Sequence, residues 1–173
     1  AEPVADATIG AVMRDVNFER RPWTLDQIER RLDDEQRLID AADADDQDTA
    51  YRLAVVRALG LERIRERLQR DQVAADPARL QGIRLGPVTL LASPFEAFLQ
   101  IKRDVQAAAR SPVPLVLNLA NDAMGYAPDQ FVTERGGYAP DQVPLMYGIM
   151  PFARLYDQLP AALLELDAEL NAG

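Results

Sequence analysis

The side chains in this chain that could do chemistry are carboxylates and phenols. Histidine, the commonest acid–base group at neutral pH and the commonest metal ligand, is absent from the sequence, and so is cysteine. The stretch GYAPDQ occurs twice, at 125–130 and at 137–142, and each copy places a tyrosine, Tyr126 or Tyr138, between a glycine and Ala-Pro. Either the two tyrosines pack against the core from two turns, or they converge on one site as metal ligand, proton donor or oxyanion partner.

Two more polar positions follow apolar runs that predict strands. Ser93 and Glu96 make the S-x-x-E pattern of a helix capping box, yet the same carboxylate could face a ligand where a strand meets a helix. Asn121 and Asp122 end the next apolar run, where they would either start a turn or line the mouth of a cleft. The sequence contains no phosphate-binding loop, no dinucleotide-binding glycine pattern and no hydrolase motif of the G-x-S-x-G or H-E-x-x-H type.

The first part of the chain predicts helices. Residues 1–22 form an extended lead-in, and 23–75 form an antiparallel helical hairpin whose first helix starts at a T-x-x-Q capping box at Thr24. The acidic turn 43–48 ends this helix and caps a second one, over about 49–72. The arginines of the second helix fit either an anion-binding surface or a solvated face that pairs with neighbouring acidic residues.

The second part, 78–173, predicts strands and helices in alternation. Two strands, 80–85 and 88–92, are separated by the turn dipeptide Gly-Pro. A helix is expected from Ser93 onward, and the continuous apolar run 113–120 is typical of a buried strand. This strand–helix–strand layer predicts an α/β fold (mixed α+β) that follows the helical hairpin.

The end of this buried strand opens into a long loop, 120–145, that holds both tyrosines. Polar groups at the carboxyl ends of such strands commonly form a site, so we expect the site in this loop. A C-terminal helix over about 152–170 closes the chain, with a kink or a break at Pro160. We therefore expect 1–173 to be a single domain or the C-terminal segment of a longer catalytic domain.

Composition excludes some partners. The chain has 173 residues, of which 48% are hydrophobic and 27% charged, and its net charge is −9. Because no basic patch dominates, nucleic acid is not an expected partner. No apolar run approaches the roughly 18 residues of a membrane span, so no transmembrane segment is expected. The first ten residues lack the pattern of a signal peptide. The localisation stays unknown, because soluble secreted and cytoplasmic proteins both have this composition.

The segment LGPVTLLASPFEAFLQIK, followed by LVLNLANDAMGYAPDQFVTERGGYAP, resembles the C-terminal part of the catalytic domain of the neutral/alkaline ceramidase family. The resemblance covers roughly residues 80–145 and implies a zinc-dependent amidase that acts on N-acyl lipids. By matching motif, Glu96 and Tyr126 would be metal ligands, and Tyr138 would be the catalytic phenol near the scissile amide. Asn121 would shape the loop behind the ligands.

Three departures from the family pattern bear on this expectation. The family's Pro-Gly-Glu is Pro94-Phe95-Glu96 here, the residue after the second tyrosine is Ala139 rather than glutamate, and the family's two histidine ligands have no counterpart. The resemblance therefore implies a segment that is incomplete on its own. The missing N-terminal half of the same protein would be its partner, zinc would bind only with histidines from that half, and the substrate would be N-acyl and lipid-like. The alternative is a non-catalytic α/β scaffold or interaction domain that keeps the fold without the metal site.

Overall fold

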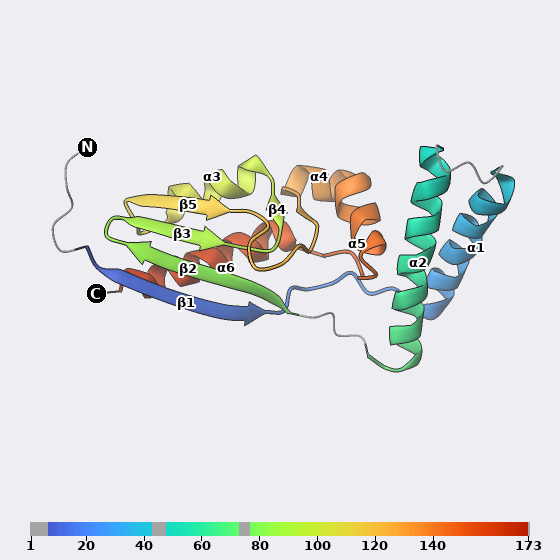
Figure 1. The fold of residues 1–173 in the computed structure, drawn as a ribbon, viewed down its shortest axis with the longest axis horizontal. Coiled ribbons are helices and arrows are strands. Elements are labelled where there is room, and N and C mark those ends of the chain that lie inside the picture. The colour runs from blue at the N-terminus through green and yellow to red at the C-terminus, as the bar shows by residue number, and fades with distance from the viewer. Residues whose placement is uncertain (1–6, 43–47, 73–76, 173) are drawn as a thin grey trace.

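A helical hairpin lies at one end of the molecule and a four-stranded sheet backed by helices lies at the other (Figure 1). The computed structural model describes residues 7–42, 48–72 and 77–172. Its mixed α/β architecture has the order that the sequence predicts, with the hairpin preceding the strand–helix–strand layer and a helix at the C-terminal end. One strand also lies within the predicted lead-in.

The hairpin consists of α1 (Leu25–Ala41) and α2 (Thr49–Gln69). Thr24 and Gln27 form the predicted capping box, in which each side chain accepts a hydrogen bond from the other's backbone N–H. Asp48 caps α2 by accepting from the Ala50 N–H, while the rest of the predicted acidic turn lies outside the described residues.

The arginines of α2 include several that are paired. Arg65 pairs with Glu62, and Arg70 pairs with Glu66 within the same helix, which fits a solvated, ion-paired face. Arg57 instead reaches α1, where it forms two hydrogen bonds of 2.8 and 2.7 Å with the buried carboxylate of Glu35. This buried pair joins the two helices.

The sheet contains β1 (Ile9–Val16), β2 (Ala78–Leu85), β3 (Val88–Ala92) and β5 (Val113–Leu117), in the order β1-β2-β3-β5. The first three strands are antiparallel neighbours, and β5 runs parallel to β3. The Gly86-Pro87 turn joins β2 to β3 as predicted, with Gly86 at φ +59°.

Helices α3 (Leu99–Ala108) and α6 (Leu155–Leu170) lie behind the sheet (Figure 1). Gly10 and Gly82 leave room for α6, because a Cβ on either would meet the side chain of Leu170. Helix α6 is continuous through Pro160, so the predicted break there is wrong. The main core lies between these helices and the sheet and includes the fully buried Leu80, Leu91, Phe95, Leu159, Leu163 and Leu166.

The predicted helix start at Ser93 is wrong. Glu96 and Ala97 form the two-residue strand β4 (Glu96–Ala97), and α3 starts only at Leu99. The backbone of 93–98 makes its hydrogen bonds with a distant segment, for example from the Glu96 N–H to the Gly125 carbonyl at 2.9 Å. Phe95 is also drawn into the core, where its ring meets Phe18 and Phe152 edge-on. These tertiary contacts outweigh the local capping pattern.

The predicted buried strand at 113–120 is also wrong in its burial. Strand β5 is the edge of the sheet, and Val113, Leu115 and Leu117 are 41–43% exposed. The run is continuous and apolar, but α3 and α6 cover only one face of the sheet, so alternate side chains face outward.

The predicted long loop 120–145 is largely regular structure. It contains β6 (Tyr126–Ala127), α4 (Gln130–Arg135), the π-helical turn η1 (Tyr138–Gln142) and α5 (Val143–Met146). The α5 turn packs on the hairpin through a second cluster formed by Ile28, Leu61, Ile64, Leu145 and Met150. The hairpin therefore braces the segment that carries both tyrosines.

Candidate functional site

A short parallel ladder brings Glu96 beside Tyr126. Strands β4 and β6 pair with Glu96 opposite Tyr126 and Ala97 opposite Ala127. Register partners in neighbouring strands lie about 4.8 Å apart, and their side chains project from the same face. The Glu96 side chain is exposed and Tyr126 is half-buried. A carboxylate and a phenol from segments 30 residues apart are thus held side by side.

Tyr138 completes a cluster of aromatic rings around this ladder. Its ring centroid lies 6.4 Å from that of Tyr126, with the planes tilted by 57°. Phe98 packs edge-on against the other side of Tyr126, at 6.0 Å. Tyr138 is 52% exposed, so part of the residue is in contact with solvent. The structure therefore brings together three of the four predicted site residues, Glu96, Tyr126 and Tyr138.

The two copies of GYAPDQ fold differently. In the first copy, Tyr126 and Ala127 form β6, and Asp129 caps α4 by accepting from the Val132 N–H at 2.9 Å. In the second copy, Tyr138–Gln142 forms the π-helical turn. The same six residues thus supply one tyrosine from a strand and another from a helical turn.

Asn121 is not directed toward this cluster. It has a φ of +69°, a left-handed conformation that Asn tolerates, and its side-chain amide donates to Oε1 of Gln81 on β2 at 3.3 Å. The turn interpretation of this residue therefore fits its geometry, and its contact is with the sheet. Asp122 also acts locally, accepting a hydrogen bond from the Ala123 N–H.

A small, mostly apolar hollow with a cavity volume of about 10 Å³ adjoins Tyr126. Its lining includes Tyr126, Pro128, Ala139, Pro140, Phe152 and Leu155. The lining comes from both copies of the repeat and from the start of α6. A hollow of this size is about large enough for one water molecule, so it does not form a substrate pocket by itself.

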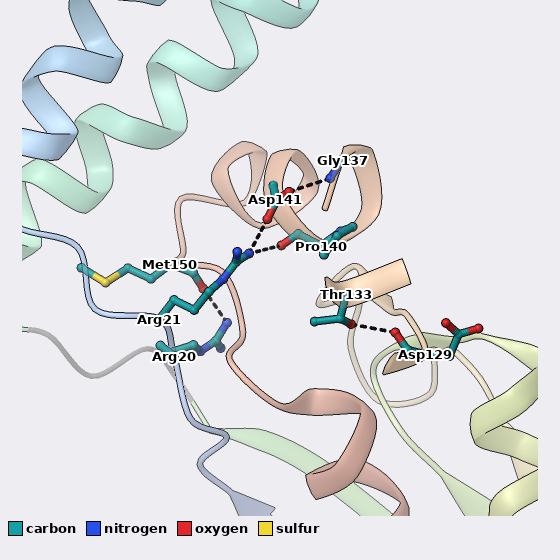
Figure 2. A network of polar contacts seen from close by, with 8 residues as sticks. All are labelled: Arg20, Arg21, Asp129, Thr133, Gly137, Pro140, Asp141 and Met150. Carbon is teal, nitrogen blue, oxygen red and sulfur yellow. Dashed lines mark hydrogen bonds and ion pairs between the residues drawn. The ribbon is translucent and has the colours of Figure 1, made fainter. Parts of the chain in front are cut away.

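Arg21 and Asp141 hold the turn that carries Tyr138 (Figure 2). Arg21, from the segment between β1 and α1, donates to Oδ1 of Asp141 at 2.5 Å and to the Pro140 carbonyl at 2.9 Å. The second oxygen of Asp141 accepts from the Gly137 N–H at 2.6 Å. Because Gly137 directly precedes Tyr138, this clamp fixes the start of the turn from which the phenol projects.

Arg20 holds the segment of Met150 and Phe152, which precedes α6, through two contacts. Its guanidinium lies 3.4 Å from the centroid of the Phe152 ring and donates to the Met150 carbonyl at 3.0 Å (Figure 2). Burial lowers the pKa of Arg20 to about 10, so the side chain remains charged at neutral pH. The charged guanidinium is therefore engaged by the Phe152 ring and the Met150 carbonyl.

Sequence reasoning missed Arg21, Asp141 and Asn118. The repeat points to Asp141, but nothing in its spacing identifies Arg21, which is more than 100 residues away. Asn118 donates to the Ala97 carbonyl at 3.4 Å, just behind β4, while its Oδ1 is buried with no hydrogen-bond partner. The Ser93 hydroxyl is likewise buried and unpartnered. Ser93 directly follows β3, as the predicted strand 88–92 implies, whereas Asn118 lies inside the predicted strand 113–120 and follows β5 only because that strand ends at Leu117.

The donor set of this chain does not complete a zinc site. Within residues 7–42, 48–72 and 77–172, no group of three or more His, Cys, Asp or Glu side chains is placed to hold a metal ion. Glu96 and Tyr126 offer one carboxylate and one phenol, whereas a catalytic zinc usually has three protein ligands and an open position. A zinc ion at this ladder would need ligands beyond those that the described residues place there.

Comparisons with protein-family models, curated proteins and solved structures gave no match for this chain. In the described part of the chain, no helix combines the length and the apolar character needed to cross a membrane.

Proposed function

We propose that this chain is the C-terminal portion of a ceramidase-like, zinc-dependent amide hydrolase that acts on N-acyl, lipid-like substrates. The observation that carries the proposal is the register of Glu96 opposite Tyr126, with Tyr138 on the same ring cluster. These are the residues that the resemblance to the neutral/alkaline ceramidase family implies as two metal ligands and a catalytic phenol.

The proposal assigns separate tasks to the three side chains. Glu96 and Tyr126 present oxygen donors from neighbouring strands, where they would act as two ligands of a metal whose remaining ligands are histidines from outside this chain. A zinc ion bound there would polarise the amide carbonyl and activate water. Zinc is therefore part of the proposal only for the assembled protein.

Tyr138 would stabilise the charge that develops on the amide oxygen. The residue is half exposed on the ring cluster, and the clamp of Arg21 and Asp141 limits how far the turn can move. A preorganised donor of this kind stabilises an oxyanion without reorganisation during the reaction.

The test uses the complete product of the reading frame that encodes this chain. Zinc is measured by elemental analysis and turnover is measured with an N-acyl lipid amide, for wild type and for Glu96→Gln. We expect Glu96→Gln to lose both zinc and turnover. The matched control is Glu134→Gln, an exposed carboxylate on α4 that hydrogen-bonds only within its helix. Equal zinc content and equal turnover in wild type and Glu96→Gln would refute the proposal.

Tyr138→Phe separates the phenol from the metal ligands. Loss of one oxyanion donor lowers kcat by about 10²–10³-fold in other enzymes. We expect a loss on that scale with unchanged zinc content, and no change for Tyr51→Phe on α2. An unchanged kcat in Tyr138→Phe would remove this residue from the mechanism.

The second candidate function is a non-catalytic α/β scaffold or interaction domain. It is favoured by the incomplete donor set and by Phe95, which occupies the position of the family's glycine and serves the core. This candidate predicts no turnover and no zinc in the complete gene product, and a Tyr126→Phe variant that differs little from wild type in stability.

A further inference from the structure

The sheet has one face that neither α3 nor α6 covers (Figure 1), which we call the open face; Asn121 reaches one corner of it through its hydrogen bond to Gln81. Pairing aligns its outward side chains in three rows across β1, β2, β3 and β5, running from Ile9 to Val113, from Ala11 to Leu115 and from Met13 to Leu117. Of these twelve positions, eleven are apolar and the exception is Gln81. The opposite face is the one that α3 and α6 cover (Figure 1).

Apolar side chains on the open face are strongly exposed. Ile9 is 77% exposed, Met13 53%, and Leu115 at the edge of the middle row 42%. The outward side chains of β5 are all apolar, although an edge strand usually carries charges that prevent association. A contiguous apolar patch of this kind marks an interaction surface.

We infer that the open face is the interface of a homodimer, in which two copies of this chain stack their sheets face to face. Two sheets packed in this way lie about 10 Å apart, with strands that cross at about 30°. A two-fold axis through the patch makes it self-complementary, since each copy presents the same rows to the other. The dimer would thus be a four-layer sandwich, with helices outside and two sheets inside. This inference is independent of the proposed function and does not use Glu96 or either tyrosine of the site.

Charge favours a second copy at this face. Each chain carries a net charge of −9, so two copies repel over most of their surfaces. None of the twelve positions is charged, and the charges next to the rows, Asp15 and Arg79, are paired with each other at 2.8 Å. The open face is therefore a neutral surface by which two acidic chains can approach. No charge is left over within it to recognise a partner of opposite sign.

The area of the face reaches what a stable dimer needs. Four strands about 4.8 Å apart and five residues at about 3.3 Å each give a flat footprint on the order of 300 Å² per copy. The accessible surface of side chains that stand above this footprint is larger, so two copies bury on the order of 1,000 Å², the lower end of specific interfaces. Homodimer interfaces are more apolar than the rest of the protein surface, and the rows of the open face share that character.

The test is the mass of the purified chain in solution, measured by light scattering after gel filtration and by sedimentation over a range of concentrations. We expect wild type at twice the 19.2 kDa chain mass. Leu115→Lys and, separately, Met13→Lys place a charge within the face and should halve the mass, with an unchanged far-UV spectrum. Leu59→Lys is the matched control, because Leu59 is 61% exposed on α2, away from the sheet, and should remain dimeric.

Three outcomes would overturn the inference. The first is a wild-type chain that is monomeric at all concentrations or forms open-ended aggregates. The second is a dimer that survives both lysine substitutions. The third is a complete gene product that is monomeric while a Leu115→Cys thiol, introduced into this cysteine-free chain, is protected from maleimide. That result would mean that another part of the same polypeptide covers the face.

Discussion

Gly60→Ala tests how closely the hairpin approaches the segment that carries the site. Gly60 lies inside α2 and is buried against α5, and a Cβ there would overlap the Leu145 carbonyl oxygen and lie 2.7 Å from its carbonyl carbon. It would also lie 3.3 Å from the backbone nitrogen of Gly148. All of these atoms belong to the backbone, so no side-chain rotation can relieve the contact.

Two opposing effects set the magnitude. Alanine is favoured over glycine inside a helix by about 1 kcal/mol, which alone would stabilise the variant. Against this, the added Cβ would lie 1.6 Å from the Leu145 carbonyl oxygen, whereas carbon and oxygen atoms in contact lie about 3.3 Å apart, so α2 and α5 must part by more than about 1.5 Å. Overpacking of a buried site costs about 1–3 kcal/mol, and the parting also loosens the cluster of Ile28, Leu61 and Leu145. We expect the steric cost to win, with a net destabilisation of about 1–2 kcal/mol and a Tm lower by about 5 °C.

The assay is urea unfolding followed by far-UV circular dichroism and by tryptophan fluorescence. Trp23 is the only tryptophan and packs against the same cluster, so its emission reports on the contact between the hairpin and α5. The control is Leu59→Ala at the preceding position. The Leu59 side chain is exposed, so this substitution should change the free energy of unfolding by no more than about 0.5 kcal/mol. If Gly60→Ala is more stable than wild type by the helix-propensity term, the close approach of α2 to Leu145 is refuted.

Three further substitutions probe buried and charged groups. Arg57→Met should destabilise the protein by about 3 kcal/mol in urea melts, since it leaves the buried Glu35 carboxylate with only the longer, 3.9 Å contact to Arg31. Adding Glu35→Leu should recover most of that loss, and a single-variant loss below about 1 kcal/mol would argue against the pair. Ser93→Ala should be neutral or stabilising by up to about 1 kcal/mol, because the deleted hydroxyl has no partner, and a marked loss of stability would reveal one. Hydrogen bonding from Arg79 lowers the pKa of Asp15 from its ordinary 3.8, so this stabilisation is present above pH 3.8 and disappears as the pH falls through the lowered value. The stability gap between wild type and Asp15→Asn should therefore shrink from neutral pH to pH 3, and a constant gap would contradict the pairing.

Local signals in the sequence were sufficient for the hairpin and for the antiparallel strands. The capping box at Thr24, the Asp48 cap and the Gly86-Pro87 turn all act within a few residues, and the structure has each of them. The helix start at Ser93 failed although its pattern was equally clear. There, the ring of Phe95 is buried in the core, and the backbone pairs with a segment about 30 residues further on. A capping box is worth about 1 kcal/mol, which tertiary burial of an aromatic ring easily exceeds.

The candidate site was predictable only in part for the same reason. The two copies of GYAPDQ are identical, yet Asp129 caps α4 while Asp141 accepts from Gly137 and pairs with Arg21. What distinguishes the copies is their surroundings, since Tyr126 has β4 as a neighbour. Sequence alone could place the phenols in one loop, but the contact between Tyr126 and Glu96 depends on a parallel pairing that no local pattern encodes.

The same pairing separates the candidate site from the open face. The rows of the open face end at Ala92 on β3 and at Leu117 on β5, and the chain then leaves the sheet to form the ladder of Glu96 and Tyr126. Ser93 and Asn118 come directly after these strand ends and make their contacts within the 93–98 and 117–127 backbone network. Asn121 of that network contacts the open face only at its corner, through Gln81. A charge at Leu115 should therefore disrupt association while the ladder stays intact, whereas Glu96→Gln should leave the mass of the chain unchanged. If either variant changed both the association of the chain and the zinc content of the complete protein, the open face and the ladder would act as one surface. The two proposals would then no longer be independent.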